Sequence, residues 1–211
     1  FTVEKEYIES KFSVSDVDPG FFQRIQAVIR ERYGLRPLNP STRAELLPRV
    51  DEMFELFNTT YSRLPSFVPV SESQKAYFKK KYLSFINPEY IKFVVDREDR
   101  IISFAIVMPS FARALQKARG HLWPFGFYHL LKARKQSRDV LFYLIGILPE
   151  YQKKGVTSII FNEYYRVFKQ KGILMGYRTP ELADNIHVQQ IWKHFNPQVY
   201  KRRCTFRKEL K

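Results

Sequence analysis

The sequence predicts a mixed α/β domain, in which helices flank a central sheet. Runs typical of β-strands alternate with segments whose apolar residues recur at helical spacing. One strand run, Val140–Leu148, is continuously apolar, which is typical of a strand that is covered on both faces. Hydrophobic residues make up 45 % of the 211 residues, so the chain can bury a sizeable core.

The first half of the chain begins with a strand and continues mainly with helices. Val3–Phe12 alternates in part and predicts a strand. A helix should follow it, because Asp18 can cap its start, Pro19 suits its first turn and Gly34 can end it. The further elements are a short strand in LRPLNP, a helix capped by Ser41 or Thr42 with the apolar stripe Leu46, Val50, Phe54 and Phe57, and a helix from about Ser71 in VSESQKAYFKKKYLSFI.

The second half predicts a hairpin and then alternating strands and helices. Two β-rich runs flank the charged turn DRED and form the clearest hairpin, between Tyr90 and Ser110. After the strand Val140–Leu148, apolar residues of the segment Gly155–Gly172 fall on one helical face. The last elements are a strand in ILMGYR, a helix over PELADNIHVQQIWKHF and a closing strand in VYKRRCTFRKEL.

A basic and aromatic insertion, residues 109–138, separates the hairpin from the continuous strand. Two short amphipathic helices are expected around GHLWPFG. The rings could touch a membrane, a nucleic acid or an acyl substrate, but packing on the core of the same domain is the simpler interpretation. The insertion could equally form a lid over an acceptor. Its cations include Arg113, Lys117, Arg119, Lys132, Arg134 and Lys135, and its rings are Phe111, Trp123, Phe125, Phe127 and Tyr128.

The overall composition narrows the classes of partner and site. The chain has 36 Lys and Arg against 21 Asp and Glu, a net charge of +15 that favours an anionic partner or else a solvated basic surface. Cys204 is the single cysteine, which excludes an intrachain disulfide and fits a reducing cytoplasm. The four histidines lack metal-ligand spacing, so we expect no metal. No apolar run reaches the roughly 18 residues of a spanning helix, and no signal peptide is evident.

A cationic turn lies between the continuous strand and the helix that follows it. Lys153, Lys154 and Gly155 occupy this turn, at the expected start of the helix. The first N–H groups of a helix have no partner within it and favour an anion. A glycine has no Cβ and lets a phosphate approach the backbone closely. The turn has the chemistry of a pyrophosphate site, although a surface turn with a single glycine is the ordinary alternative.

The turn and its lead-in, ILPEYQKKGVT, resemble motif A of the GNAT acyltransferase superfamily, with Gln152, Gly155 and Thr157 at the motif positions. The resemblance implies a mostly antiparallel twisted sheet with a splayed parallel strand pair at the cofactor cleft. It implies that acetyl-CoA, or another acyl-CoA, is the co-substrate. The backbone from Gln152 to Thr157, with Lys153, Lys154 and Val156, would then bind the pyrophosphate. The backbone of Ile145, Ile147 and Leu148 would face pantetheine.

A second stretch of the same resemblance lies in ADNIHVQQIWKHF. Asn185 takes the position of the family's asparagine and belongs to the implied cofactor site. Trp192 replaces the tyrosine that often protonates the leaving thiolate, and an indole N–H is too weak an acid for that step. Glu150 and Tyr143 are the candidate catalytic residues, with Tyr177 and His187 as further candidate bases. A solvated carboxylate and a core ring are the alternatives for Glu150 and Tyr143.

The resemblance divides the chain into two parts. Residues 1–34 would be the closing strand of a preceding module plus a linking helix, and residues 35–211 the acyltransferase domain. The whole resembles the C-terminal half of longer bacterial GNAT-related proteins with two such modules, and we expect a segment before Phe1. The expected function is acyl transfer to an amine in the cytoplasm. The alternatives are a catalytically weak binding module and a binder of nucleic acid or anionic membrane, and a homodimer also stays open.

Overall fold

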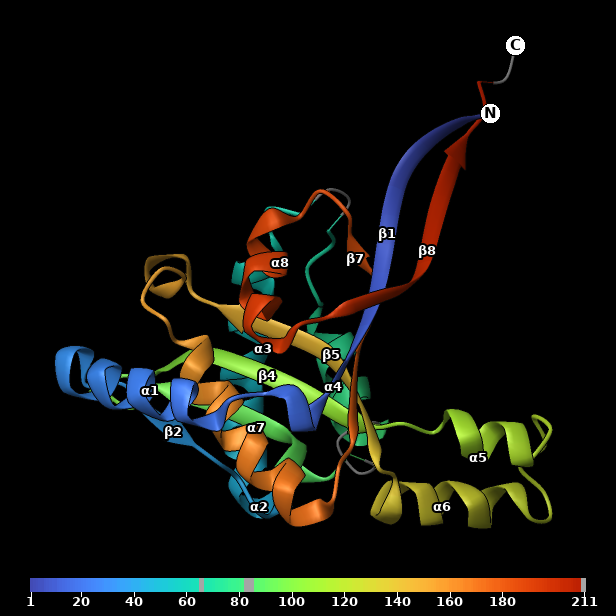
Figure 1. The fold of residues 1–211 in the computed structure, drawn as a ribbon, viewed down its shortest axis with the longest axis horizontal. Coiled ribbons are helices and arrows are strands. Elements are labelled where there is room, and N and C mark those ends of the chain that lie inside the picture. The colour runs from blue at the N-terminus through green and yellow to red at the C-terminus, as the bar shows by residue number, and fades with distance from the viewer. Residues whose placement is uncertain (65–66, 82–85, 210–211) are drawn as a thin grey trace. The chain divides into compact units, whose positions relative to one another are not determined.

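The computed structural model describes residues 1–64, 67–81 and 86–209 (Figure 1). It confirms the mixed α/β class: helices flank an eight-stranded, mostly antiparallel sheet with the hydrogen-bonded order β2-β3-β4-β5-β6-β1-β7, and β8 pairs with β1. The strands are β1 Thr2–Ser13, β2 Arg36–Leu38, β3 Ile91–Val95, β4 Ile101–Pro109, β5 Asp139–Ile147, β6 Met175–Arg178, β7 Glu181–Leu182 and β8 Gln198–Arg207.

The helices lie close to where the sequence places them. Thr42 caps α2 as predicted, with its hydroxyl accepting from the Glu45 N–H at 3.3 Å while the Glu45 carboxylate accepts from the Ser41 N–H at 2.8 Å. The helices are α1 Pro19–Tyr33, α2 Arg43–Leu46, α3 Val50–Tyr61, α4 Glu72–Lys81, α5 Ala112–Lys117, α6 Gly126–Gln136, α7 Thr157–Lys171 and α8 Ile186–Trp192. The predicted continuation of α4 through residues 82–85 lies outside the described residues. Within the described residues, no helix is long and apolar enough to cross a membrane.

The chain forms two compact units. Unit 1 comprises the N-terminal segment Phe1–Asp18, the segment Pro109–Phe142 and the chain from Phe168 onwards. Unit 2 comprises the described parts of Pro19–Met108 together with Tyr143–Val167. Strand β5 and helix α7 therefore each begin in one unit and end in the other.

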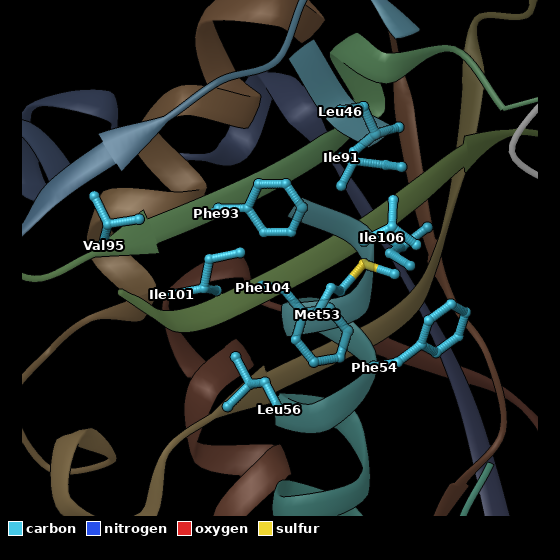
Figure 2. Close-up of a cluster of buried hydrophobic side chains, with 11 residues drawn as sticks. Leu46, Met53, Phe54, Leu56, Ile91, Phe93, Val95, Ile101, Phe104 and Ile106 are labelled. Atoms are coloured by element: carbon cyan, nitrogen blue, oxygen red, sulfur yellow. The ribbon is translucent and has the colours of Figure 1, made fainter. Parts of the chain in front are cut away.

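The core of unit 2 forms where α3 packs on β3 and β4 (Figure 2). The stripe predicted for this region is confirmed, since Leu46, Val50 and Phe54 are buried and Phe57 packs against the same cluster. The other members are Met53, Leu56, Ile91, Phe93, Val95, Ile101, Phe104 and Ile106. The apolar residues of α3 recur at helical spacing, so they form one face of the helix, and that face covers the β3–β4 hairpin.

A buried tyrosine anchors the part of helix α7 that lies in unit 2. The Tyr164 hydroxyl lies 2.8 Å from the carbonyl oxygen of Ala105 and 2.9 Å from that of Tyr90, and it donates toward both. Complete burial raises the pKa of Tyr164 well above its ordinary value, so the hydroxyl stays protonated as a donor. The start of α7, where the sequence predicts the anion site, thus belongs to a well-anchored helix.

Aromatic side chains dominate the core of unit 1. Trp192 packs edge-on against Phe142, with ring centroids 4.8 Å apart, and it also contacts Phe12 and Phe195. Phe12 belongs to β1, which pairs antiparallel with β6, β7 and β8. Residues 1–34 are therefore divided between the units, with β1 in the sheet of unit 1 and α1 in unit 2.

The helix predicted over Pro180–Phe195 is wrong in its first part. Glu181 and Leu182 form the short strand β7 on β1, and helix α8 begins only at Ile186. Pairing with β1 and the bond from Arg178 Nε to the Glu181 carboxylate, at 3.0 Å, hold this segment extended. Tertiary contacts override local helix propensity here.

Two burial predictions also need correction. Strand β5 is not covered along its whole length, because Tyr143 in its middle is 45 % exposed while Val140 and Ile147 are buried. The two helices expected in the insertion are confirmed as α5 and α6, but the interpretation that its rings pack on the core is wrong. Trp123 is 86 % exposed and Phe125 71 %. The buried positions of this hairpin are the small residues Ala114 and Gly126, which leaves Trp123, Phe125, Phe127 and Tyr128 exposed and Phe111 half-buried.

Candidate functional site

The turn between β5 and α7 leaves several backbone donors unused. It starts with a 3-10 turn over Pro149–Tyr151 and leads to the start of α7 at Thr157. The N–H groups of Tyr151, Gln152 and Lys154 donate to carbonyl oxygens within the turn. For four others no acceptor is found among the described residues: Lys153, Gly155, Val156 and Thr157. Four neighbouring donors at a helix start form a region suited to an anion.

Gly155 is required by the backbone of this turn. Its φ is +72°, in the left-handed region that favours glycine. A Cβ at this position would lie 3.0 Å from Ile29 Cδ1 and 3.5 Å from Ile25 Cγ2, both on α1. The structure thus corrects the reason given for this glycine: α1, and not space for a phosphate, lies in the direction of the absent Cβ.

The two lysines of the turn have different surroundings. Lys154 Nζ lies over the rings of Tyr151 and Tyr33, 4.4 Å and 5.2 Å from their centroids, which holds it against the protein by cation–π attraction. Lys153 is exposed, and within the described part of the chain no ion pair or hydrogen bond of its side chain is found. Lys153 can therefore bind a ligand without giving up such contacts, whereas Lys154 would have to leave the two rings.

Strand β5 leads into the turn with one edge partly unpaired. Its parallel pairing with β6 covers only Asp139–Phe142. The Leu148 N–H donates to the Ile102 carbonyl oxygen at 3.0 Å, so by strand alternation the N–H groups of Ile145 and Ile147 point away from β4. No strand pairs with that edge over residues 143–147 in the described chain.

Side chains already use the carbonyl groups of the same stretch. The Tyr61 hydroxyl donates to the Ile145 oxygen at 3.0 Å, and Gln152 Nε2 donates to the Ile147 oxygen at 3.2 Å. Leu148 uses both of its backbone groups, because its carbonyl accepts from the Tyr151 N–H at 2.8 Å. The sequence placed Gln152 in the cofactor site, and in the structure its side chain connects the turn to β5.

The candidate catalytic side chains are accessible. Glu150 lies exposed in the 3-10 turn, and Tyr143 is exposed on β5. Both stay predictions, since exposure permits a catalytic role without assigning one. Tyr177 packs edge-on against Tyr200 at 5.8 Å, and the side chain of His187 lies outside the described residues. Among the described side chains, no group of three or more His, Cys, Asp or Glu is arranged to hold a metal ion.

Asn185 and Trp192 have structural roles in unit 1. Asn185 caps α8, with its side-chain oxygen accepting from the Val188 N–H at 3.3 Å. Trp192 is only 2 % exposed, and the Arg178 guanidinium lies 5.0 Å from the centre of its ring. The position that carries a proton-donating tyrosine in the resembled family is here part of the hydrophobic core.

A buried ionic group beside Trp192 was not found from the sequence. Arg178 donates to the Glu181 carboxylate and to the Ser10 hydroxyl, the latter at 2.9 Å. Burial raises the pKa of Glu181, while the hydrogen bonds and the positive charge of Arg178 act to lower it. The only sequence signal was an arginine and a glutamate three residues apart, which is common on any surface.

The chain resembles both a protein of known sequence and several solved structures. No protein-family model matches it. Over 140 residues it is 24 % identical to Protein YghO of Escherichia coli (strain K12), a match that covers 65 % of this chain and 35 % of that protein.

Two solved structures share its fold. A GCN5-related N-acetyltransferase from Sphaerobacter thermophilus superposes with a TM-score of 0.59 at 7 % identity, over 97 % of this chain and 51 % of that one. The C-terminal DUF2156 domain of a lysylphosphatidylglycerol synthetase from Agrobacterium fabrum gives 0.51 at 9 % identity, over 91 % and 51 %. The chain spans about half or less of the length of these three proteins. The likeness establishes that this chain has the fold of the GCN5-related N-acetyltransferases (GNAT).

Proposed function

We propose that the chain is an acyl-CoA-dependent N-acyltransferase that moves an acyl group, in the first instance acetyl, from CoA to an amine. The observation that carries the proposal is the turn before α7. It presents four backbone donors beside the exposed Lys153, at the place where a GNAT fold changes from its central strand to a helix. The free, exposed Cys204 fits a cytoplasmic location, which we include in the proposal.

The proposed cofactor site extends along β5. The pyrophosphate would accept from the N–H groups of Lys153, Gly155, Val156 and Thr157, with the positive end of the α7 dipole adding to the attraction. The pantetheine arm would bond to the N–H groups of Ile145 and Ile147. Leu148 has no backbone donor left for it, because its N–H is bonded to Ile102. Lys154 is occupied by two rings and contributes through its charge.

The reaction needs little covalent chemistry from the protein. The nitrogen lone pair of a neutral amine attacks the thioester carbonyl carbon, the carbon–sulfur bond breaks, and the thiolate leaves with that electron pair. An N–H of β5 can stabilise the developing oxyanion, and holding both substrates together lowers the entropic cost. The proton lost by the amine must pass to a base or to water, and the exposed Glu150 and Tyr143 are the candidates.

A second candidate function is a GNAT-like module that binds without catalysing. The burial of Trp192 favours it, because the side chain at the usual acid position is enclosed by aromatic rings. The fold by itself does not select acetyl-CoA as the acyl donor, because one structural neighbour is named for a lysyl group and phosphatidylglycerol.

The test is release of free CoA thiol from acetyl-CoA in the presence of a panel of amines. We expect amine-dependent release, and a fall in kcat of about 10²-fold or more for Glu150→Gln or Tyr143→Phe if that residue is the base. Glu98→Gln is the matched control, because Glu98 is also an exposed glutamate of a turn in unit 2. Stabilisation by CoA without turnover would support the binding module. The absence of both stabilisation and turnover would contradict both functions.

A further inference from the structure

The helical hairpin α5–α6, residues 111–138, carries an exposed apolar tip. Figure 1 shows the two helices side by side, joined by the connecting turn. In that turn and the first turn of α6, Leu122, Trp123, Phe125, Phe127 and Tyr128 are each at least 58 % exposed. Large apolar side chains gathered at one exposed place in this way mark an interaction surface.

The tip is an ordered part of the fold. The Phe127 N–H donates to the Leu122 carbonyl oxygen at 2.8 Å. A Cβ on Gly126 would lie 1.9 Å from the His121 oxygen, so the turn closes tightly at that glycine. At the base of the hairpin, the Ser110 N–H and the Ser137 hydroxyl both donate to the Asp139 oxygen at 2.8 Å. The rings are thus presented by a hairpin fixed at both ends.

The arms of the hairpin are strongly cationic. Between Ser110 and Asp139 the sequence contains seven lysines and arginines and no aspartate or glutamate. Asp139 itself lies at the base, where its carboxylate is 3.4 Å from Arg113. The surface around the hairpin therefore complements a dense negative charge.

Rings and charges are segregated along the hairpin. Residues 120–131 contain the four rings of the tip, Trp123, Phe125, Phe127 and Tyr128, and no lysine or arginine. The cations begin at Arg119 on one arm and at Lys132 on the other. In sites for single-stranded nucleic acid, by contrast, the stacking rings lie within a basic groove that follows the nucleic-acid backbone. An uncharged aromatic tip between cationic arms fits the boundary of a bilayer, where Trp and Tyr sit at the headgroup level and Lys and Arg meet phosphates.

We propose that the hairpin 111–138 docks this protein on the surface of a membrane that contains anionic phospholipid. The side chains of the tip enter the interface, with Trp123 foremost since it is 86 % exposed. The cations of the arms bind headgroup phosphates. This inference uses no feature of the turn before α7, so it stands or falls independently of the acyltransferase proposal.

The experiment is flotation of the whole chain with vesicles of phosphatidylcholine, with and without about 30 % phosphatidylglycerol, at about 0.1 M and about 1 M salt. We expect binding to the anionic vesicles at low salt only. Trp123→Ala/Phe125→Ala and Lys132→Glu/Lys135→Glu should each weaken it by about tenfold or more. Lys80→Glu/Lys169→Glu, which reverses two exposed lysines outside the hairpin, should bind nearly as the wild type does. Circular dichroism checks that each variant is folded.

Tryptophan emission gives a second readout that a merely electrostatic contact would not change. The chain has two tryptophans, and Trp192 is already buried. We therefore expect a blue shift on vesicle binding that disappears in Trp123→Phe, while binding of that variant persists. Equal binding to both kinds of vesicle, or none to either, would overturn the proposal. So would tight binding to RNA or DNA that Trp123→Ala/Phe125→Ala abolishes, which would identify the tip as a nucleic-acid surface.

Discussion

Replacing Trp192 by alanine is expected to lower the free energy of unfolding by about 3–5 kcal/mol. The indole is 2 % exposed and lies among Phe12, Phe142 and Phe195. Its removal would leave a cavity in the aromatic core of unit 1 and would also take away a partner of the Arg178 guanidinium. Chemical denaturation monitored by circular dichroism measures the change.

The chain supplies a matched control for this substitution. Trp123→Ala removes the same side chain from a position that is 86 % exposed, so its effect should stay within about 0.5 kcal/mol. Similar losses for the two variants would show that Trp192 is not the core residue described above. A stable Trp192→Ala variant that gained acyl transfer would contradict the structural role even more directly.

Gly155→Ala is expected to destabilise the chain by about 2 kcal/mol, from two sources. The left-handed backbone costs any residue with a Cβ about 1 kcal/mol or more, and the new methyl group would press on Ile29 Cδ1 at 3.0 Å. Gly172→Ala isolates the first source, since Gly172 has φ +64° and nothing within 4 Å of its Cβ position. We expect the Gly172 variant to lose about half as much, measured by the same denaturation experiment.

Equal losses for the two glycine variants would mean that α1 does not pack on the turn. A loss at Gly155 smaller than at Gly172 would argue against the turn geometry as a whole. The comparison matters for the site, because the position of α1 decides which side of the turn is left for a ligand.

Most of the element order was predictable because most elements carry a local signal. The capping side chain of Thr42 indicated the start of its helix. The strands of the β3–β4 hairpin were indicated by β-branched residues around a charged turn. The resemblance at Gln152 and Gly155 added the GNAT fold, which the solved structures confirm. These signals lie within a few residues of one another, so a single sequence contains them.

Features that depend on distant parts of the chain were not predictable. The same aromatic and basic pattern suits rings that pack on a core and rings on a projecting hairpin, and only the small buried residues Ala114 and Gly126 decide between them. Glu181 became a strand residue by pairing with Ile8 on β1, near the opposite end of the sequence. The sequence also offered no sign that Ile29 lies against Gly155.

Titration of CoA into the whole chain by calorimetry tests the central claim most directly, that the turn before α7 is a pyrophosphate site. We predict saturable binding that Lys153→Glu weakens by about tenfold or more, since a carboxylate would replace the cation nearest the phosphates. Lys169→Glu, at the exposed opposite end of the same helix, should leave the affinity nearly unchanged. No saturable binding at about 1 mM CoA, or equal losses in both variants, would contradict the account.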